Sequence, residues 1–189
     1  HYKLLNDIDM AGVSITPIGI PSVNSSEATI FTGTFDGNGY AIKNLTISQT
    51  KAPYMGFVAQ NAGVIKNLML INTTQIMDIV YNTEHADAGG FAAYNTGTIE
   101  NCGIFNSSIS LIHRRNDTNQ WTGGDIWYKG WFESKFDYYD DSTALICRSS
   151  VGGIAGRNEG ESGIIKNCHV DRCSMWSEAT VGQTDAYVR

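Results

Sequence analysis

The sequence predicts an all-β fold in which short strands stack as the coils of a parallel β-solenoid. Three observations support this prediction. A strand-and-turn motif recurs along the chain, and no run of ten or more residues shows the helical period of 3.6. The composition is the third: twenty glycines accompany three prolines, and charged residues make up only 17% of the chain, against about 25% in typical globular domains. Many tight turns and many side chains hidden between layers fit that composition.

The main repeat reads aliphatic residue, charged residue, asparagine, Leu or Cys, any residue, aliphatic residue. It occurs at residues 40–47, 64–70, 98–104 and 164–170. The last three copies follow a second shared segment, which occupies residues 56–63, 90–97 and 153–160. The core asparagines Asn44, Asn67, Asn101 and Asn167 are separated by 23, 34 and 66 residues. A repeat of roughly 20–30 residues made of short strands and turns corresponds to one coil of a solenoid.

Stacked coils place equivalent residues in columns, with about 4.8 Å between layers. We align Ile42, Leu45 and Ile47 with Ile65, Leu68 and Leu70, and we expect a bend at the intervening asparagine to bring both flanking aliphatics inside. The residues predicted to be buried are Ile65, Leu68, Ile99, Ile104, Ile165 and Val170.

The repeated asparagines are expected to form internal ladders in which the amides bond the backbone at each bend. One ladder comprises Asn44, Asn67, Asn101 and Asn167, and a second comprises Asn61, Asn95 and Asn158. The alternative is that these asparagines are merely surface turn residues. Their regular recurrence in an otherwise variable sequence favours the ladders.

At these residues the sequence resembles the GLUG-repeat surface proteins, which are found in large secreted adhesins and beside IgA-cleaving metallopeptidases. Residues 2–10, 16–19 and 31–40 resemble the segment that usually precedes those repeats, and the resemblance covers residues 1–112 and 149–175. It implies a right-handed parallel β-helix at an extracellular or cell-surface location. It implies little about activity, because these repeats are usually stalks or accessory regions. We therefore expect a structural or adhesive role, with neighbouring domains or subunits of a surface assembly as partners.

Residues 113–148 interrupt the repeat. We predict one domain over residues 1–189, read as a section of a longer chain, with 113–148 as an insertion between coils. The insertion is rich in aromatic residues, and it either packs against the flank of the solenoid or makes contacts with a glycan or a neighbouring subunit. The candidate contact residues are Trp121, Trp127, Tyr128, Trp131, Tyr138 and Tyr139. Asp137, Asp140 and Asp141 would then bond sugar hydroxyls. They could also hold Ca²⁺, although they lack the ligand spacing of an EF-hand loop; no other cofactor is indicated.

No catalytic constellation is recognisable, so we expect a non-catalytic protein. The zinc motif His-Glu-x-x-His and the Gly-x-Ser-x-Gly elbow are both absent, and the four histidines lack the spacing of metal ligands. A polysaccharide-active enzyme is the least favoured alternative. The net charge of −6 argues against nucleic acid as a partner. No run of about 18 apolar residues occurs, so no membrane span is expected in this segment.

The chain also contains four cysteines and five glycosylation sequons. Disulfides could join Cys102, Cys147, Cys168 and Cys173 in three connectivities. Cys102 and Cys168 share a column, where a bond would be strained, so a stack of free thiols is the alternative. Sequons occur at Asn24, Asn44, Asn72, Asn106 and Asn116. We expect Asn44 to stay unmodified inside its ladder, Asn24 and Asn116 to be accessible, and Asn72 and Asn106 to share a column.

Overall fold

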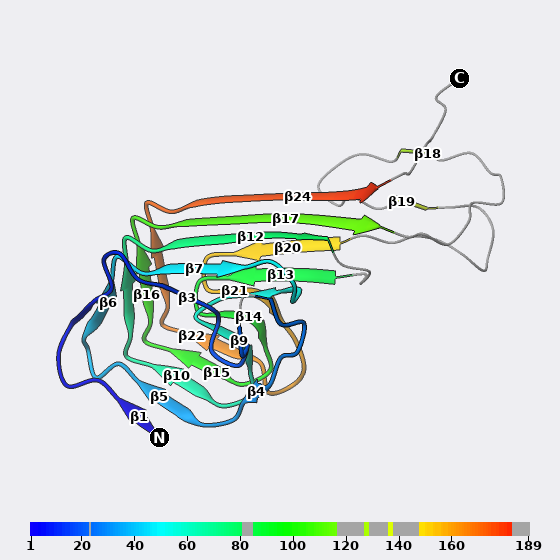
Figure 1. The fold of residues 1–189 in the computed structure, drawn as a ribbon. Helices are drawn as coiled ribbons and strands as arrows, with labels where there is room; N and C mark the ends of the chain where they lie inside the picture. Colours follow the sequence, from blue (N-terminus) through cyan, green and yellow to red (C-terminus); the bar gives the residue numbers. More distant parts are fainter. Residues whose placement is uncertain (23, 81–84, 117–126, 129–135, 138–147, 183–189) are drawn as a thin grey trace.

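The computed structural model describes residues 1–22, 24–80, 85–116, 127–128, 136–137 and 148–182. Within these ranges the protein consists of strands and turns, with no helix. Five parallel sheets lie around a common core, and each takes one strand from successive passages of the chain (Figure 1). The predicted all-β fold with stacked parallel strands is therefore confirmed.

The five sheets are named A to E. Sheet A contains β1 (Tyr2–Lys3), β5 (Thr34–Asp36), β10 (Val64–Lys66), β15 (Thr98–Glu100) and β22 (Ile164–Lys166). Sheet B contains β2 (Ile8–Asp9), β6 (Ala41–Lys43), β11 (Met69–Ile71), β16 (Gly103–Phe105) and β23 (His169–Asp171). Sheet C contains β3 (Ser14–Ile15), β7 (Thr46–Gln49), β12 (Thr74–Val80), β17 (Ser108–Asn116) and β24 (Ser174–Gly182).

The two remaining parallel sheets are smaller. Sheet D contains β4 (Ile30–Phe31), β9 (Val58–Asn61), β14 (Ala92–Asn95) and β21 (Ala155–Asn158). Sheet E contains β8 (Tyr54–Met55), β13 (His85–Gly89) and β20 (Arg148–Gly152). Between β17 and β20, within the predicted insertion, β18 (Trp127–Tyr128) pairs with β19 (Phe136–Asp137) in antiparallel fashion.

One passage of the chain through the sheets is called a coil. Coil 1 is β1–β3, coil 2 is β4–β7, coil 3 is β8–β12, coil 4 is β13–β17 and coil 5 is β20–β24. Paired residues of sheet A are 30 residues apart from Asp36 to Lys66, 34 from Lys66 to Glu100, and 66 from Glu100 to Lys166. The last separation is the longest, because the chain between β17 and β20 adds residues that have no counterpart between the earlier coils.

The predicted alignment of residues 40–47 with 64–70 is wrong. Ile42 pairs with Leu70 and Ile47 with Gln75, whereas the partner of Ile65 in coil 2 is Phe35. The error has a physical cause: an asparagine followed by an inward residue occurs at two successive corners of the coil, so one corner resembles the next. Between sheets A and B, coil 2 also uses residues 37–40 where coil 3 uses only Asn67 and Leu68.

The core consists of aliphatic columns that continue from coil to coil. Ile65 and Ile99 are paired and fully buried, as are Leu70 and Ile104. The predicted bend is present, because Asn67 has a left-handed backbone, with φ of 53°, and Leu68 beyond it is also buried. Four of the six predicted core residues are therefore fully buried: Ile65, Leu68, Ile99 and Ile104.

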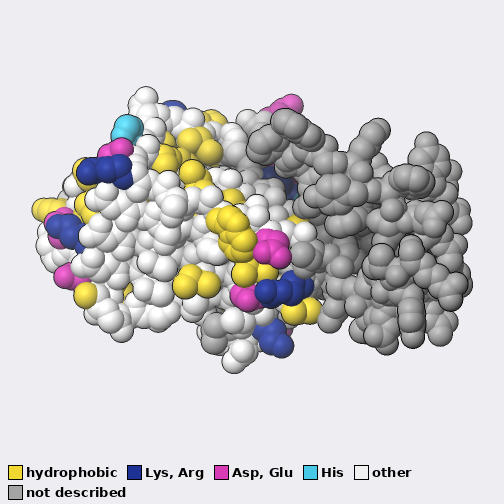
Figure 2. Space-filling model, turned by 90° about the horizontal axis from the view of Figure 1, so that it is seen from above, with side chains coloured by type: hydrophobic (Ala, Val, Ile, Leu, Met, Phe, Trp, Pro, Cys, Tyr) yellow, Lys and Arg dark blue, Asp and Glu magenta, His cyan; other side chains and the backbone are white. Residues whose placement is uncertain are grey.

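The prediction of burial is wrong for Ile165 and Val170, each of which is 39% exposed. Both hold the expected register with coil 4. They belong to coil 5, however, and no described strand pairs with its other edge. Figure 2 is seen from above Figure 1, the side on which β24 lies, and hydrophobic side chains are visible there among polar ones.

Charges alternate in sign along the outward column of sheet A. The order by pairing is Lys3, Asp36, Lys66, Glu100, Lys166. The Lys166 Nζ lies 2.7 Å from Glu100 Oε2 and the Lys66 Nζ lies 3.8 Å from Asp36 Oδ2. Exposed pairs of this kind stabilise by only about 0.2–1 kcal/mol each. Their larger effect is on register, since an alternative pairing of coils would place like charges opposite each other.

Close stacking requires glycine in one column. A Cβ atom at Gly97 would collide with the carbonyl oxygen of Gly63, and one at Gly63 would collide with that of Gly33. In the Asn-x-Gly turns of coils 3 and 4 the glycine is thus explained by backbone approach between coils, whereas Gly160 at the end of the third such turn has a left-handed backbone, with φ of 79°.

The column assignment predicts different effects for one substitution at two coils. Ile99→Asp places a charge without a counter-ion between layers and should lower the free energy of unfolding by on the order of 4 kcal/mol. Ile165→Asp, in the same column but partly exposed, should cost less than about 2 kcal/mol. Urea unfolding of both variants measures the difference, and equal losses would contradict the column.

Candidate functional site

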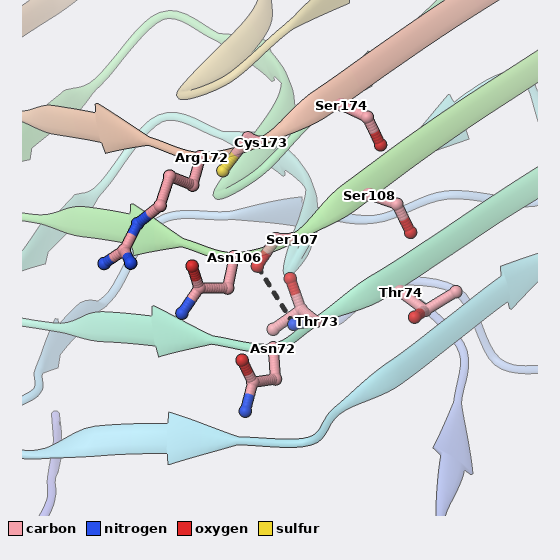
Figure 3. Close-up of a pocket in the computed structure, with 9 residues that line it drawn as sticks. All are labelled: Asn72, Thr73, Thr74, Asn106, Ser107, Ser108, Arg172, Cys173 and Ser174. Carbon is pink, nitrogen blue, oxygen red and sulfur yellow. Dashed lines mark hydrogen bonds between the residues drawn. The ribbon is translucent and has the colours of Figure 1, made fainter.

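A shallow groove follows the corner between sheets B and C across coils 3, 4 and 5 (Figure 3). Each coil contributes three consecutive residues, so the groove has three levels. The lining residues are Asn72, Thr73, Thr74, Asn106, Ser107, Ser108, Arg172, Cys173 and Ser174. Amide and guanidinium groups lie on one side and the hydroxyls of Thr74, Ser108 and Ser174 on the other. Every lining side chain thus carries a polar or thiol group, and apolar atoms of the same residues contribute the rest of the surface.

The amide side of the groove is built on a left-handed corner. Asn72, Asn106 and Arg172 have φ angles of 54°, 49° and 51°, a region that asparagine tolerates better than most residues. Asn44 has the same conformation, with φ of 56°, and accepts a hydrogen bond of 3.3 Å from Asn72 Nδ2. Asn44 therefore belongs to this column and not, as predicted, to the one that contains Asn67.

The ladder at the corner between sheets A and B begins with an aspartate. Asn67 Nδ2 donates to Asp36 Oδ1 at 3.0 Å, Asn101 to Asn67 at 3.2 Å, and Asn167 to Asn101 at 3.3 Å. These amides bond one another along the stack instead of the backbone. Asn67 is half-buried and the last two are exposed, so the predicted internal position is wrong. These asparagines are therefore surface turn residues, and they also form a ladder.

The second predicted ladder is the internal one. Asn61 and Asn95 are buried, and their Nδ2 atoms donate at 2.7 Å to Oδ1 of Asn95 and Asn158 respectively. Asn95 Nδ2 also donates to the Gly97 carbonyl at 3.1 Å. Here the amides bond both the next coil and the turn backbone, so this ladder ties coils 3, 4 and 5 together.

The three described cysteines are free thiols. Cys102 Sγ and Cys168 Sγ each donate at 3.3 Å to the carbonyl two residues earlier, that of Glu100 and of Lys166. Burial raises the pKa of the Cys102 thiol to about 12, which keeps it protonated and unreactive. A disulfide between Cys102 and Cys168 is thus not formed, Cys173 is also free, and Cys147 lies outside the described residues.

Three sequons lie at the corner between sheets B and C. Each has a left-handed corner asparagine, an inward residue, and then the first outward residue of sheet C, which is Thr46, Thr74 or Ser108. Asn72 and Asn106 are exposed and stand in one column. Asn24 is also exposed, in a loop. The side chain of Asn116 is outside the described part. The fold alone therefore accounts for an asparagine and a hydroxyl residue at this spacing.

A buried carboxylate marks a second polar cluster, on sheets D and E. The side chain of Asp87 is 1% exposed, and its Oδ2 lies 3.0 Å from Arg157 Nη2. The Arg157 guanidinium stacks 4.4 Å from the centre of the Tyr94 ring, and Tyr94 Oη donates to Glu159 Oε2 at 3.2 Å. Removal from water raises the pKa of Asp87 to about 6, with the positive charge of Arg157 opposing that rise.

The sequence indicated neither this cluster nor its partners. A signal was present, because aligning the second shared segment places Gln60, Tyr94 and Arg157 at one position, and these residues do pair in sheet D. The cluster can exchange a proton near pH 6. Burial and the stacked Arg157 favour a structural role.

The predicted insertion contacts lie largely outside the described residues. This holds for Trp121, Trp131, Tyr138 and Tyr139, and for Asp140 and Asp141 of the candidate Ca²⁺ site. Trp127, Tyr128 and Asp137 are in β18 and β19, but their side chains are not described. Among described residues no group of three or more His, Cys, Asp or Glu could hold a metal ion. No described helix is long and apolar enough to cross a membrane.

Comparison with known proteins agrees with the repeat architecture. The GLUG motif family matches residues 148–172, which span β20 to the corner after β23. Halomucin of Haloquadratum walsbyi is 35% identical over 82 residues, which is 40% of this chain and 1% of that protein. No solved structure matches. The resemblance to GLUG-repeat proteins is thereby confirmed, and the matching residues 148–172 form most of coil 5.

The two ladders should differ in their contribution to stability. Asn95→Ala removes a buried amide and leaves Asn61 and Asn158 without their 2.7 Å partners, so unfolding should become easier by about 2 kcal/mol. Asn101→Gly removes a rung of the surface ladder without straining the left-handed backbone and should cost under about 1 kcal/mol. Urea midpoints compare the two, and a larger loss for Asn101→Gly would contradict the assignment.

The raised pKa of Asp87 predicts an unusual dependence of stability on pH. Between about pH 4 and pH 6 the unfolded chain loses this proton while the folded protein keeps it, so stability should fall as pH rises through that window. The expected change is on the order of 2–3 kcal/mol. Asp7, Asp9 and Asp36 have lowered pKa values, so they affect stability only at more acidic pH.

Thermal unfolding between pH 4 and pH 7 measures this effect. Asp87→Asn should flatten the curve over pH 4–6, while Glu161→Gln, at an exposed turn, should leave the slope as in the parent. A parent slope of the opposite sign, or an unchanged slope in Asp87→Asn, would show that Asp87 does not control it.

Proposed function

We propose that this chain is a segment of a right-handed parallel β-helix that acts as a non-catalytic structural or adhesive part of a larger extracellular surface protein. The observation that carries the proposal is repetition of the same contacts at every coil. An asparagine ladder, alternating charges and aliphatic columns each link one coil to the next. Such nearest-neighbour contacts extend a protein along one axis without requiring a closed core.

The comparisons support the surface location. Residues 148–172 match the GLUG motif, and the protein that is similar over 82 residues is named halomucin. The partners under this proposal are neighbouring domains of the same surface assembly. The predicted role of the insertion as a glycan-binding or docking loop stays a hypothesis about residues outside the described ranges.

The location can be tested directly on cells of the source organism. An antibody raised against this chain should label intact cells, or precipitate the parent protein from the medium. Labelling that appears only after the cells are permeabilised would contradict an extracellular role. A cytoplasmic protein labelled in the same samples controls for leakage.

The absence of catalysis is tested separately. Incubation of the chain with a panel of neutral and anionic polysaccharides should release no new reducing ends or unsaturated sugars. If turnover occurs and Asp87→Asn abolishes it, the protein is an enzyme and the proton-exchanging cluster on sheets D and E is its site.

A further inference from the structure

The outward face of sheet C carries an exposed tryptophan that the sequence analysis did not single out. In β12 the odd-numbered residues from Gln75 to Ile79 are buried and the even-numbered ones are outward. Trp176 pairs with Ser110, which pairs with the outward Ile76. Trp176 is therefore on the outward face, and it is 51% exposed. It stands two residues beyond Ser174, the top level of the groove (Figure 3).

We propose that this face of sheet C and the adjoining groove bind a neutral, linear glycan chain that runs along the stack. This site is distinct from the aromatic insertion. It also goes beyond the proposed function, because a structural β-helix needs no glycan site.

The indole supplies an apolar platform. Because a strand rises about 3.3 Å per residue, Trp176 lies roughly 7 Å from Ser174 on the same face. A flat aromatic side chain at a surface packs well against the C–H face of a sugar ring, while its N–H remains available for a hydrogen bond. Ile76, which is 48% exposed, is a second apolar side chain in this column, two coils away and separated from Trp176 by Ser110.

The edge of sheet C that borders the groove supplies hydrogen-bonding groups at a regular interval. A hydroxyl occupies the first outward position of sheet C in all five coils: Ser14, Thr46, Thr74, Ser108 and Ser174. Neighbouring coils are about 4.8 Å apart, which is close to the length of one pyranose ring. Hydroxyls both donate and accept, as sugar hydroxyls do, so a chain along the stack meets the same chemistry at every level.

The charges of this face favour a neutral ligand. Its two described arginines already have acidic partners: Arg114 pairs with Asp78, and the Arg172 Nε lies 3.1 Å from Asp171 Oδ2. Glu178 is outward and exposed in the same column as Asp78. These carboxylates can accept hydrogen bonds from sugar hydroxyls, and they repel the acid groups of a uronate chain.

Isothermal titration of the full chain tests the proposal. The probes are hexasaccharides of β-1,4-linked glucose, N-acetylglucosamine and xylose, together with a galacturonate hexamer as the anionic comparison. At least one neutral hexamer should bind. Trp176→Ala should weaken that binding about tenfold, which corresponds to about 1.4 kcal/mol. Trp176→Phe should retain most of it, and the pair Thr74→Val and Ser108→Ala should weaken it further.

Two controls distinguish loss of the binding site from loss of the fold. Trp176→Ala should keep the melting temperature of the parent within a few degrees, since half of this side chain is in water. Trp127→Ala, in the insertion, should bind as the parent does. The proposal is overturned if no neutral hexamer binds at millimolar concentration, if only the galacturonate hexamer binds, or if Trp127→Ala loses binding while Trp176→Ala does not. None of these outcomes bears on a structural surface role.

Discussion

In-register parallel pairing between coils is the constraint on which the rest of this structure depends. At a layer spacing of about 4.8 Å, every residue lies directly on its counterpart in the next coil. Stacking therefore favours like residues in the core, as where Ile65 meets Ile99, and opposite charges in sheet A, as where Lys166 meets Glu100. Exceptions occur, since Ile47 is paired with Gln75. Glycine recurs in the column of Gly63 and Gly97 because no Cβ fits there. The sequence repeat is the direct consequence of this pairing.

Asparagine has two separate uses in the coils. At the two outer corners it is chosen for the left-handed backbone, and its amide reaches an equivalent amide at the surface. In sheet D, Asn61 and Asn95 are buried, and their amides satisfy both a turn carbonyl and the next coil. Loss of a buried amide leaves its partners without hydrogen bonds or water, whereas water replaces a lost surface amide. Asparagines that recur in the same way in the sequence thus differ in how much they contribute to stability.

Repetition also organises the surface. The outward columns of sheet C repeat a hydroxyl at every coil and add an exposed Trp176 at the last. Asp87 represents the opposite case, since its carboxylate is almost removed from water and its paired residues in the two adjacent coils are Tyr54 and Ser150. Its charged partner Arg157 is 25% exposed. The first feature suits reversible contacts with a polymer, and the second makes the fold sensitive to mild acidity.

The sequence by itself determined the fold class, the layers and the identity of most core columns. This was possible because equivalent positions in successive coils require similar residues. Ile99, Ile104 and Asn95 could therefore be assigned from the equivalent residues of the other repeats. Only the tertiary structure decided which corner Asn44 occupies, because two corners share one local pattern and the distinction lies in pairing. It also decided that Ile165 and Val170 are exposed, since burial depends on the coil above and not on the residue. The sites at Asp87 and Trp176 join residues from different coils. Alignment of the repeated segment indicates the adjacency of Tyr94 and Arg157, but the burial of Asp87 and the position of Trp176 depend on the tertiary structure.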